Sequence, residues 1–379
     1  MRTKRFLILL LTLMLLTCYP TAAQAADLGL TAKSALLLDA QSGDVLYELN
    51  STEQAYPASC TKLMTLLLTL EAVEAGAISL EDTVTTSAEA ASMGGSQVYL
   101  YDGEQRTVQD MLIAIAVGSG NDASYAMAEY VGGSYEHFIE LMNKRAAELG
   151  MTGTHFVNPH GLHDADHYTT AADLGKLALQ CLQTPHFLDY TSIYEYEFRP
   201  DPRQLVLWNT NRLLKWYDGT LGLKTGYTPE AGHNLVSCIE RDGLRLIGVV
   251  LGVEANRGHF SESMKLLNFG FNSYTFNLLH SAGDTITSAL VEKGEMPSVA
   301  LTCAENVGYS SLKTATAEIS EVVELQPLCA PLTAGDTAGT LHVYKDGELF
   351  ADVPLLVAQD VPRCGFGKAW LKMLNTLGM

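Results

Sequence analysis

The chain has 379 residues, which predicts about two domains, because single hydrophobic cores stop growing at roughly 250–300 residues. Hydrophobic residues make up 47% and charged residues 18%, a balance that excludes a disordered or low-complexity protein. The net charge of −19 disfavours nucleic acid as a partner, since an acidic surface repels phosphate backbones. The seven cysteines include no CxxC pair, so neither a zinc ribbon nor a dithiol redox motif is expected.

Residues 1–25 have the pattern of a secretory signal peptide. Basic residues near the start precede an apolar run from Phe6 to Leu16, and Ala23-Gln24-Ala25 fits a small-x-small cleavage site. The apolar run is short for a membrane span, so a retained anchor helix is the weaker alternative, as is a lipoprotein site at Cys18. The sequence predicts export. Six cysteines remain after cleavage, and their pairing stays open between disulfides and buried free thiols.

The next part of the chain alternates between strand and helix patterns. Apolar runs at 34–40 and 44–49 flank Ser42-Gly43 and predict a hairpin. Helices are predicted at 59–75, 111–117, 122–131, 135–149, 171–183 and 261–274. Thr107, Ser134 and Thr170 are the predicted caps of the second, fourth and fifth of these. A second hairpin is predicted for 234–240 and 244–253. Strands at both ends with helices between them predict an α+β domain with a mainly antiparallel sheet, assigned to residues 26–276.

Two further segments follow this domain. Glycines separate short β-rich runs such as 340–344 and 349–356, which predicts a small all-β domain over residues 280–361. Residues 362–379 predict an amphipathic helix with Phe366, Trp370, Met373, Leu374 and Leu377 on one face and Lys368, Lys372 and Asn375 on the other. The helix is too short to span a bilayer but long enough to lie in its interface. An ordinary docking helix is the alternative.

Three short motifs occur in order along the first domain: Ser59-Cys60-Thr61-Lys62, Ser119-Gly120-Asn121 and Lys224-Thr225-Gly226. Each is weak alone, but the ordered triple in an exported chain is specific. A helix places residues i and i+3 on one face, so Lys62 can reach the Ser59 hydroxyl. Serine needs a base to become a nucleophile. Lysine, with an ordinary pKa of about 10.4, is a base only where burial or a second cation disfavours its charge. Lys224 is the candidate second cation.

The blocks around these motifs resemble the D-alanyl-D-alanine carboxypeptidases, the low-molecular-mass penicillin-binding proteins of peptidase family S11. The resembling blocks are residues 57–65, 119–123, 156–162, 209–211 and 222–232. The resemblance covers nearly all of the chain after residue 25, including the β domain and the tail. It implies the fold of the serine β-lactamases and penicillin-binding proteins, followed by the small all-β domain.

The resemblance also implies a role for each motif residue. Ser59 would be the acylated nucleophile and Lys62 its base, while Ser119 and Asn121 would line the cleft and relay protons. Lys224, Thr225 and Gly226 would form the edge strand that pairs with the substrate and receives its terminal carboxylate. The backbone N–H groups of Ser59 and Tyr227 would form the oxyanion hole. No metal or cofactor is expected.

Two positions depart from the family pattern. Cys60 replaces the Thr or Ser expected beside the nucleophile, and we expect it to point away from the cleft. Thr210 stands where some relatives have an arginine that binds carboxylate, which leaves that contact open.

The resemblance implies a serine D-Ala-D-Ala carboxypeptidase that acts on peptidoglycan stem pentapeptides at the outer face of the membrane or in the cell wall. β-Lactams would acylate the same serine, and the tail would bind the membrane surface. A D,D-endopeptidase, a β-lactamase and a catalytically silent peptidoglycan-binding scaffold are the alternatives. The β-lactamase is weaker because Glu140 and Asn143 lack the spacing of its deacylating pair. Two further candidate sites are weaker than their structural alternatives. A metal cluster is less favoured than ordinary loop structure for His160, His163, Asp164, Asp166 and His167. A sugar or peptide groove is less favoured than plain packing for Trp208, Trp216 and Tyr217.

Overall fold

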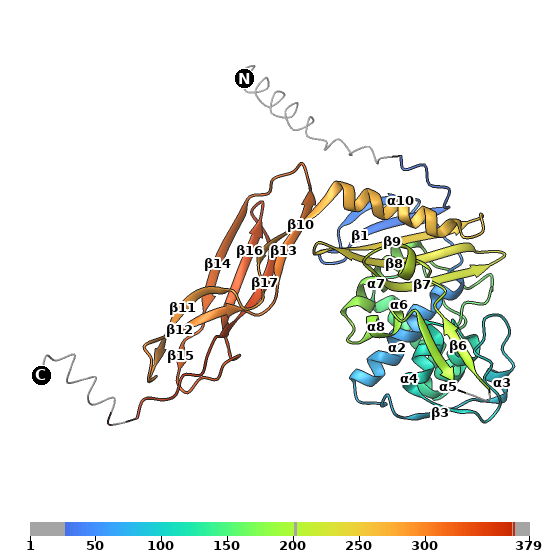
Figure 1. Cartoon of the computed structure of the whole chain (residues 1–379), viewed down its shortest axis with the longest axis horizontal. Helices are drawn as coiled ribbons and strands as arrows, with labels where there is room; N and C mark the ends of the chain where they lie inside the picture. The colour runs from blue at the N-terminus through green and yellow to red at the C-terminus, as the bar shows by residue number, and fades with distance from the viewer. Residues whose placement is uncertain (1–26, 201–202, 366, 368–379) are drawn as a thin grey trace, which may run out of the picture.

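The computed structural model describes residues 27–200, 203–365 and 367. The predicted signal peptide and most of the predicted tail helix lie outside these residues. The described chain forms two parts, a larger one with a sheet and helices and a smaller one made of strands (Figure 1). This is the predicted fold class, an α+β catalytic-type domain with an antiparallel sheet followed by an all-β domain.

The larger part is built on a five-stranded antiparallel sheet. Its strand order is β2 (Val45–Leu49), β1 (Ser34–Asp39), β9 (Leu244–Val253), β8 (Gly232–Arg241) and β7 (Thr220–Thr228). Both predicted hairpins, β1–β2 and β8–β9, are confirmed. Strand β7 lies at the edge of the sheet, so one side of its backbone has no strand partner and is available to an extended peptide.

Helices cover both faces of this sheet. Helix α10 (Gly258–Ser273) packs on one face, over a buried cluster that includes Leu37, Leu246 and Leu267 (Figure 1). The other face carries the larger core and the remaining helices, which are α2 (Lys62–Glu74), α4 (Val108–Ala116), α5 (Asn121–Gly132), α6 (Tyr135–Glu148) and α7 (Ala171–Gln183). The sequence motifs all lie on this second face or at its rim.

The three predicted caps are confirmed. The hydroxyls of Thr107, Ser134 and Thr170 each accept a hydrogen bond from the backbone N–H three residues later, at distances of 3.0–3.1 Å. Each bond satisfies a donor that the first helical turn leaves without an intrahelical partner. The caps therefore fix where α4, α6 and α7 begin.

Several short elements have no counterpart in the sequence patterns. They are α3 (Ala88–Ala91), α8 (Phe187–Thr191), α9 (Leu213–Trp216) and the two-stranded pairs β3 (Thr83–Thr85) with β4 (Gln105–Thr107) and β5 (Glu195–Arg199) with β6 (Leu205–Trp208). Elements of three to five residues are too short to show a hydrophobic period, so tertiary contacts decide them.

The smaller part contains a two-stranded sheet and a six-stranded sheet. Strand β10 (Tyr274–His280) pairs with β13 (Val307–Leu312). The larger sheet has the order β14 (Ile319–Leu325), β16 (Thr337–Lys345), β17 (Glu348–Val357), β12 (Ser298–Cys303), β11 (Thr285–Glu292) and β15 (Leu328–Cys329). A separate buried cluster that includes Leu301, Leu341 and Leu355 forms its core. Strand β10 pairs with β13 and is therefore the first strand of the smaller part. It begins at Tyr274, whereas the sequence assigned residues 280–361 to this domain.

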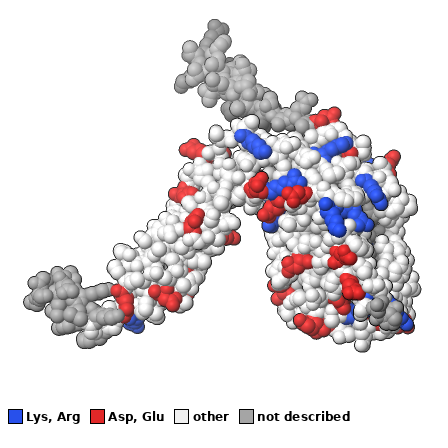
Figure 2. Space-filling model, viewed as in Figure 1, with Lys and Arg blue, Asp and Glu red and all other residues white. Residues whose placement is uncertain are grey.

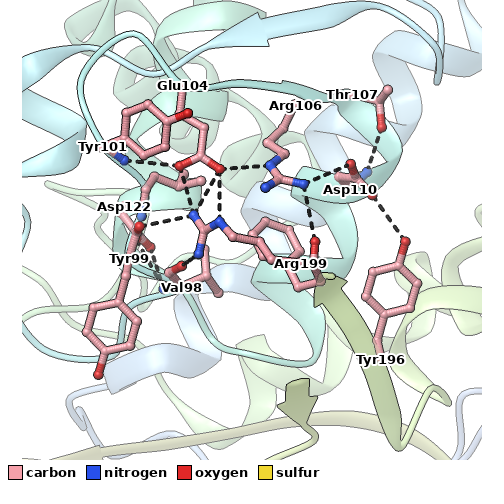
Figure 3. Close-up of polar contacts among 12 residues, drawn as sticks. Val98, Tyr99, Tyr101, Glu104, Arg106, Thr107, Asp110, Asp122, Tyr196 and Arg199 are labelled. Atoms are coloured by element: carbon pink, nitrogen blue, oxygen red, sulfur yellow. Dashed lines mark hydrogen bonds and ion pairs between the residues drawn. The ribbon is translucent and has the colours of Figure 1, made fainter. Parts of the chain in front are cut away.

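A buried ion pair joins strand β5 to the loop that precedes β4. The Arg199 guanidinium donates to both carboxylate oxygens of Glu104 at 2.8–3.1 Å and to the carbonyls of Val98 and Tyr99 at 2.8 and 3.0 Å (Figure 3). Burial alone would raise the pKa of Glu104, but hydrogen bonds from Arg199 and Arg106 outweigh it and lower that pKa. The pair therefore holds the 98–104 loop against the edge of the helical layer.

We expect Arg199→Met to destabilise the protein by about 1.5–3 kcal/mol, because the buried Glu104 carboxylate loses the hydrogen bonds from Arg199 and keeps only its ion pair with Arg106. Urea unfolding at neutral pH measures the change. Adding Glu104→Gln should recover part of the loss, since the buried charge that Arg106 alone would have to balance is then gone. Arg203, whose side chain is exposed, is the matched control, and Arg203→Met should leave the free energy of unfolding almost unchanged. Equal effects of the two arginine variants would contradict this account.

Candidate active site

The serine of the first motif lies in a short 3₁₀ helix, η1 (Ala58–Thr61), which leads directly into α2. Ser59 is partly exposed, whereas Ala58 and Cys60 on either side are buried. Ala58 has a φ of 48°, in the left-handed region that non-glycine residues rarely adopt. Such strained residues persist only where the surroundings hold them, and they concentrate at functional sites. The turn thus presents one hydroxyl to solvent from a rigid, buried frame.

Lys62 is the first residue of α2 and is completely buried. Its Nζ lies 2.9 Å from Ser59 Oγ, 2.7 Å from Asn121 Oδ1 and 2.6 Å from the His160 carbonyl oxygen. The Asn121 amide is oriented by its Nδ2, which donates to the Gly94 carbonyl at 2.7 Å. Asn121 Oδ1 and His160 O can only accept. A neutral amine at this position therefore gives both N–H groups to them and keeps its lone pair for the Ser59 hydroxyl.

The electrostatics favour that neutral amine. Burial is the main cause that lowers the pKa of Lys62 well below its ordinary value, and the nearby charge of Lys224 lowers it further. Burial also lowers the pKa of Lys224, to about 8. The charge of Lys224 disfavours a second charge on Lys62, so the pair favours a neutral Lys62 as the base beside a charged Lys224.

The second motif occupies the loop between α4 and α5. Ser119 is 3% exposed and has a φ of 56°, and Asn121 is the first residue of α5. The Asp122 carboxylate accepts hydrogen bonds from the backbone N–H groups of Val98 and Leu100 at 3.0–3.2 Å (Figure 3). The loop that Arg199 holds is therefore also tied to the start of α5. Within the described residues the Ser119 hydroxyl makes no hydrogen bond, so it is free to meet a ligand.

The third motif lies on the edge strand β7, directly against the nucleophile turn. A Cβ added to Gly226 would lie 2.9 Å from the Ser59 nitrogen and 2.7 Å from the Pro57 carbonyl oxygen, closer than real side chains come. Glycine at this position therefore allows the strand to approach the turn. Lys224 is 1% exposed, and Tyr227 is 58% exposed. Of the four predicted binding residues, Lys224, Thr225 and Gly226 are buried in the edge strand, and the Tyr227 side chain is exposed.

The two departures from the family pattern have clear contacts. Cys60 is fully buried, and its thiol donates to the Lys224 carbonyl at 3.5 Å, so it joins η1 to β7. Burial raises the pKa of Cys60 to about 12, which keeps it an unreactive thiol. Thr210 Oγ1 accepts a hydrogen bond from Thr225 Oγ1 at 2.6 Å. The residue in the arginine position therefore supports the side chain of Thr225.

The sequence analysis missed the role of the 156–162 block. The His160 carbonyl contacts Lys62, and the Pro159 carbonyl accepts from Thr65 on α2 at 2.6 Å. A Cβ on Gly161, whose φ is 85°, would collide with the Ala58 carbonyl. This block is packed against both ends of the nucleophile turn. Its similarity to the family pattern was the only signal, because backbone carbonyls leave no trace in a sequence.

The histidines of this region act as structural groups. His167 Nδ1 accepts from the Val157 N–H at 3.0 Å, so its Nε2 carries the hydrogen and donates to Thr61 Oγ1 at 2.7 Å. Burial lowers the pKa of His167 to about 4 and that of His160 to about 3, so both are neutral. In the part of the chain that the structure describes, no cluster of three or more His, Cys, Asp or Glu side chains could hold a metal ion.

Other candidates from the sequence also have structural contacts. Glu140 is exposed on α6 beside His137, and Asn143 binds the backbone of Phe156, so they do not form a deacylating pair. Trp208 and Trp216 are 46% and 53% exposed. The six cysteines in the described residues are free thiols, four of them buried.

Comparisons with known proteins match both parts of the chain to family models. The family model for D-alanyl-D-alanine carboxypeptidase, peptidase S11, matches residues 20–255, and that for the C-terminal domain of penicillin-binding protein 5 matches residues 274–363. The D-alanyl-D-alanine carboxypeptidase DacF of Bacillus subtilis is 39% identical over 367 residues, which cover 94% of each chain.

Solved structures give the same result. Penicillin-binding protein 5 of Haemophilus influenzae is similar with a TM-score of 0.66 and 33% identity, over 88% of this chain and 98% of that one. Penicillin-binding protein D2 of Listeria monocytogenes, solved in an ampicillin-bound form, is similar with a TM-score of 0.58 and 31% identity, over 64% of this chain and 98% of that one.

Proposed function

The chain belongs to the D-alanyl-D-alanine carboxypeptidases of peptidase family S11, and we propose that it works through an acyl-enzyme on Ser59. The protein is a serine-type D-Ala-D-Ala carboxypeptidase and a penicillin-binding protein. The comparisons do not favour the endopeptidase or the silent scaffold. What remains to be proposed is the role of each residue, the substrate and the location.

The observation that carries the mechanism is the set of contacts around Lys62. Its amine is 2.9 Å from Ser59 Oγ, and its other two partners are both oxygen acceptors. Neutral Lys62 takes the Ser59 proton as Oγ attacks the carbonyl carbon of the penultimate D-Ala. The carbonyl oxygen becomes negatively charged in the tetrahedral intermediate. The N–H groups of Ser59 and Tyr227 donate to it, and such donors are worth roughly 10²–10³ each in rate.

Collapse of this intermediate breaks the C–N bond. The leaving D-alanine amine takes a proton from Lys62, with Ser119 as the proposed relay, and the acyl group stays on Ser59. A water molecule then attacks the ester carbonyl and gives its proton to Lys62, which passes it to Ser59 Oγ as the ester C–O bond breaks. A β-lactam acylates Ser59 by the same attack, but its leaving nitrogen remains tethered through the opened ring.

Strand β7 is the proposed binding site for the substrate backbone. It is a sheet edge, and an extended peptide can add to it as a further strand. Lys224 and Thr225 are the proposed partners of the terminal carboxylate. The single O–H of Thr225 is donated to Thr210 Oγ1 at 2.6 Å, so it reaches the carboxylate only by exchanging this hydrogen bond, and Lys224 supplies the charge.

The deciding experiment is mass spectrometry of the intact protein with a stem pentapeptide and with a labelled penicillin. We expect release of free D-alanine from the pentapeptide. We expect one covalent penicillin, on the tryptic peptide that contains Ser59. Label on any other peptide, or a pentapeptide that remains intact, would contradict the proposed function.

The proposed location is outside the cytoplasm. Family members act on peptidoglycan, which is extracytoplasmic, and the pattern of residues 1–25 supports export. The acidic composition fits this role, because no nucleic acid needs to be bound. Acidic side chains are scattered over both parts of the face in Figure 2, while Lys and Arg gather mainly on the upper region of the larger part. Within residues 27–200, 203–365 and 367, no helix combines the length and the apolar character needed to cross a bilayer.

We expect deletion of residues 363–379 to release the protein from membranes. The apolar residues of this segment would enter the acyl boundary, and Lys368 and Lys372 would meet anionic head groups at about 1 kcal/mol each. The measurement is sedimentation with anionic phospholipid vesicles, using long and short chains that both lack residues 1–25. Activity on a small soluble peptide should be the same for the two. Equal sedimentation would mean that the segment is a packing helix.

A further inference from the structure

The two proposed oxyanion donors lie on different elements, and their spacing depends on how those elements are joined. The Ser59 N–H belongs to η1, and the Tyr227 N–H belongs to β7. An oxyanion hole works because its donors are fixed before the charge develops. Neighbouring residues on β8, His233 and Asn234, contact both elements. In the sheet register, His233 lies opposite Tyr227 and Asn234 lies opposite Gly226.

Asn234 connects the sheet to the chain that precedes the nucleophile. Its side chain is completely buried, and its Nδ2 donates to the carbonyl oxygens of Tyr56 and Pro57 at 2.8 and 3.1 Å. Its Oδ1 accepts from the Gly252 N–H on β9 at 2.8 Å. Both donors and an acceptor site of the amide are in use, so its orientation is fixed. The two carbonyls lie just before Ala58, the residue with the left-handed backbone. Asn234 thereby anchors the start of the strained turn that carries Ser59.

His233 supports the other donor through its ring. The rings of Tyr227 and His233 are stacked with centroids 4.4 Å apart, and the rings of His233 and His259 are stacked at 5.1 Å and nearly parallel. Phe260 lies behind His259 at 4.0 Å. The column therefore runs from α10, which lies on the far face of the sheet, to the exposed Tyr227 at the active-site edge.

The histidines in this column serve as flat rings. His259 is 6% exposed, and its Nδ1 is buried without a hydrogen-bond partner among the described residues. Burial lowers the pKa of both histidines, and the neighbouring His233 contributes to lowering that of His259 to about 4. At neutral pH the column is uncharged. Because the buried Nδ1 of His259 makes no hydrogen bond among the described residues, we infer that this side chain contributes mainly through the packing of its ring.

We propose that His233 and Asn234 are positioning residues that hold the two halves of the oxyanion hole in register, Asn234 through the Tyr56 and Pro57 carbonyls and His233 through the Tyr227 ring. The inference rests on the proposed oxyanion role of the Ser59 and Tyr227 N–H groups. Asn234 is completely buried and His233 packs against the Tyr227 ring, so both are proposed to act through other residues. Their loss should slow the chemical step and leave ground-state binding unchanged, because the oxyanion exists only in the transition state and the intermediate.

The test separates the noncovalent dissociation constant of a penicillin from its acylation rate constant by stopped-flow fluorescence. His233→Ala should slow acylation by about 10- to 100-fold with an unchanged dissociation constant, the range expected when a donor is misplaced rather than removed. His233→Phe keeps a flat ring and should restore the rate. Asn234→Asp keeps the acceptor, loses both donors and should slow acylation by a similar factor.

Matched controls remove the same interactions elsewhere. Tyr135→Ala breaks the stacked Tyr125–Tyr135 pair, whose centroids are 4.4 Å apart. Asn277→Asp removes an amide in the smaller part that donates to the Tyr309 carbonyl and the Ser311 hydroxyl at 3.2 and 3.0 Å. Both controls should lower stability and leave acylation of the folded protein unchanged.

Four results would overturn the inference: unchanged acylation in His233→Ala, no rescue by His233→Phe, equal losses in the controls, or a loss confined to the dissociation constant. If Asn234→Asp does not fold, the half-buried His233 still decides the question. Failure of the proposed function would be seen separately, as penicillin bound to a residue other than Ser59 in the unmodified chain.

Discussion

Ser59→Ala is expected to abolish covalent labelling by penicillin and to reduce carboxypeptidase activity by roughly 10⁴-fold or more, as loss of a nucleophile does in comparable enzymes. The substitution removes a single oxygen from a partly exposed side chain and leaves the buried frame of Ala58 and Cys60 intact. Intact-mass spectrometry after incubation with penicillin measures the labelling. The melting temperature of the variant should match that of the unmodified chain.

The control for this variant is another hydroxyl of the same region. Thr65→Val removes the hydrogen bond to the Pro159 carbonyl, and Thr65 is completely buried one turn after Lys62. That variant should be less stable yet still labelled. Persistent labelling of Ser59→Ala at another residue would show that the nucleophile has been misassigned.

The sequence predicted the elements that carry long patterns. The β1–β2 and β8–β9 hairpins have alternating or apolar runs next to turn residues, and the caps Thr107, Ser134 and Thr170 each begin a clear helical period. The short pairs β3–β4 and β5–β6 escaped because their positions depend on contacts between distant segments. The buried pair Glu104–Arg199 joins residues 95 positions apart, and a charge pattern alone would have placed both side chains on the surface.

The active site could be predicted in its chemical groups but not in its supports. Ser59, Lys62 and Asn121 stand out as side chains with known chemistry, and the i, i+3 spacing predicted the contact between the first two. The His160 carbonyl that completes the environment of Lys62 is a backbone atom. The amide of Asn234 is equally silent in a sequence, because an asparagine on a strand does not reveal which carbonyls it reaches. These supporting groups are identified by their spatial contacts and not by their residue types.

Lys62→Arg should slow acylation by roughly 10²–10⁴-fold, the usual contribution of a general base, because guanidinium stays protonated at all relevant pH values. Lys62→Met, which removes the amine and fills a similar volume, should be impaired to a similar degree. The reason lies in the buried amine, whose lone pair faces the Ser59 hydroxyl once both N–H groups are taken by Asn121 and His160. Stopped-flow acylation by a fluorescent penicillin measures the loss, and circular dichroism checks that both variants fold.

The pH dependence gives an independent check on the same base. Lys62 is competent only above its own pKa, which burial and the charge of Lys224 place well below the ordinary lysine value, so kcat/KM should rise as pH increases through that pKa. Lys224 has a pKa of about 8, and its cation is the proposed partner of the substrate carboxylate, so kcat/KM should fall again above about pH 8. The expected profile for the free enzyme is therefore a bell. Near-normal acylation by Lys62→Arg, or a rate that keeps rising up to the ordinary lysine pKa of about 10.4, would mean that another group removes the Ser59 proton.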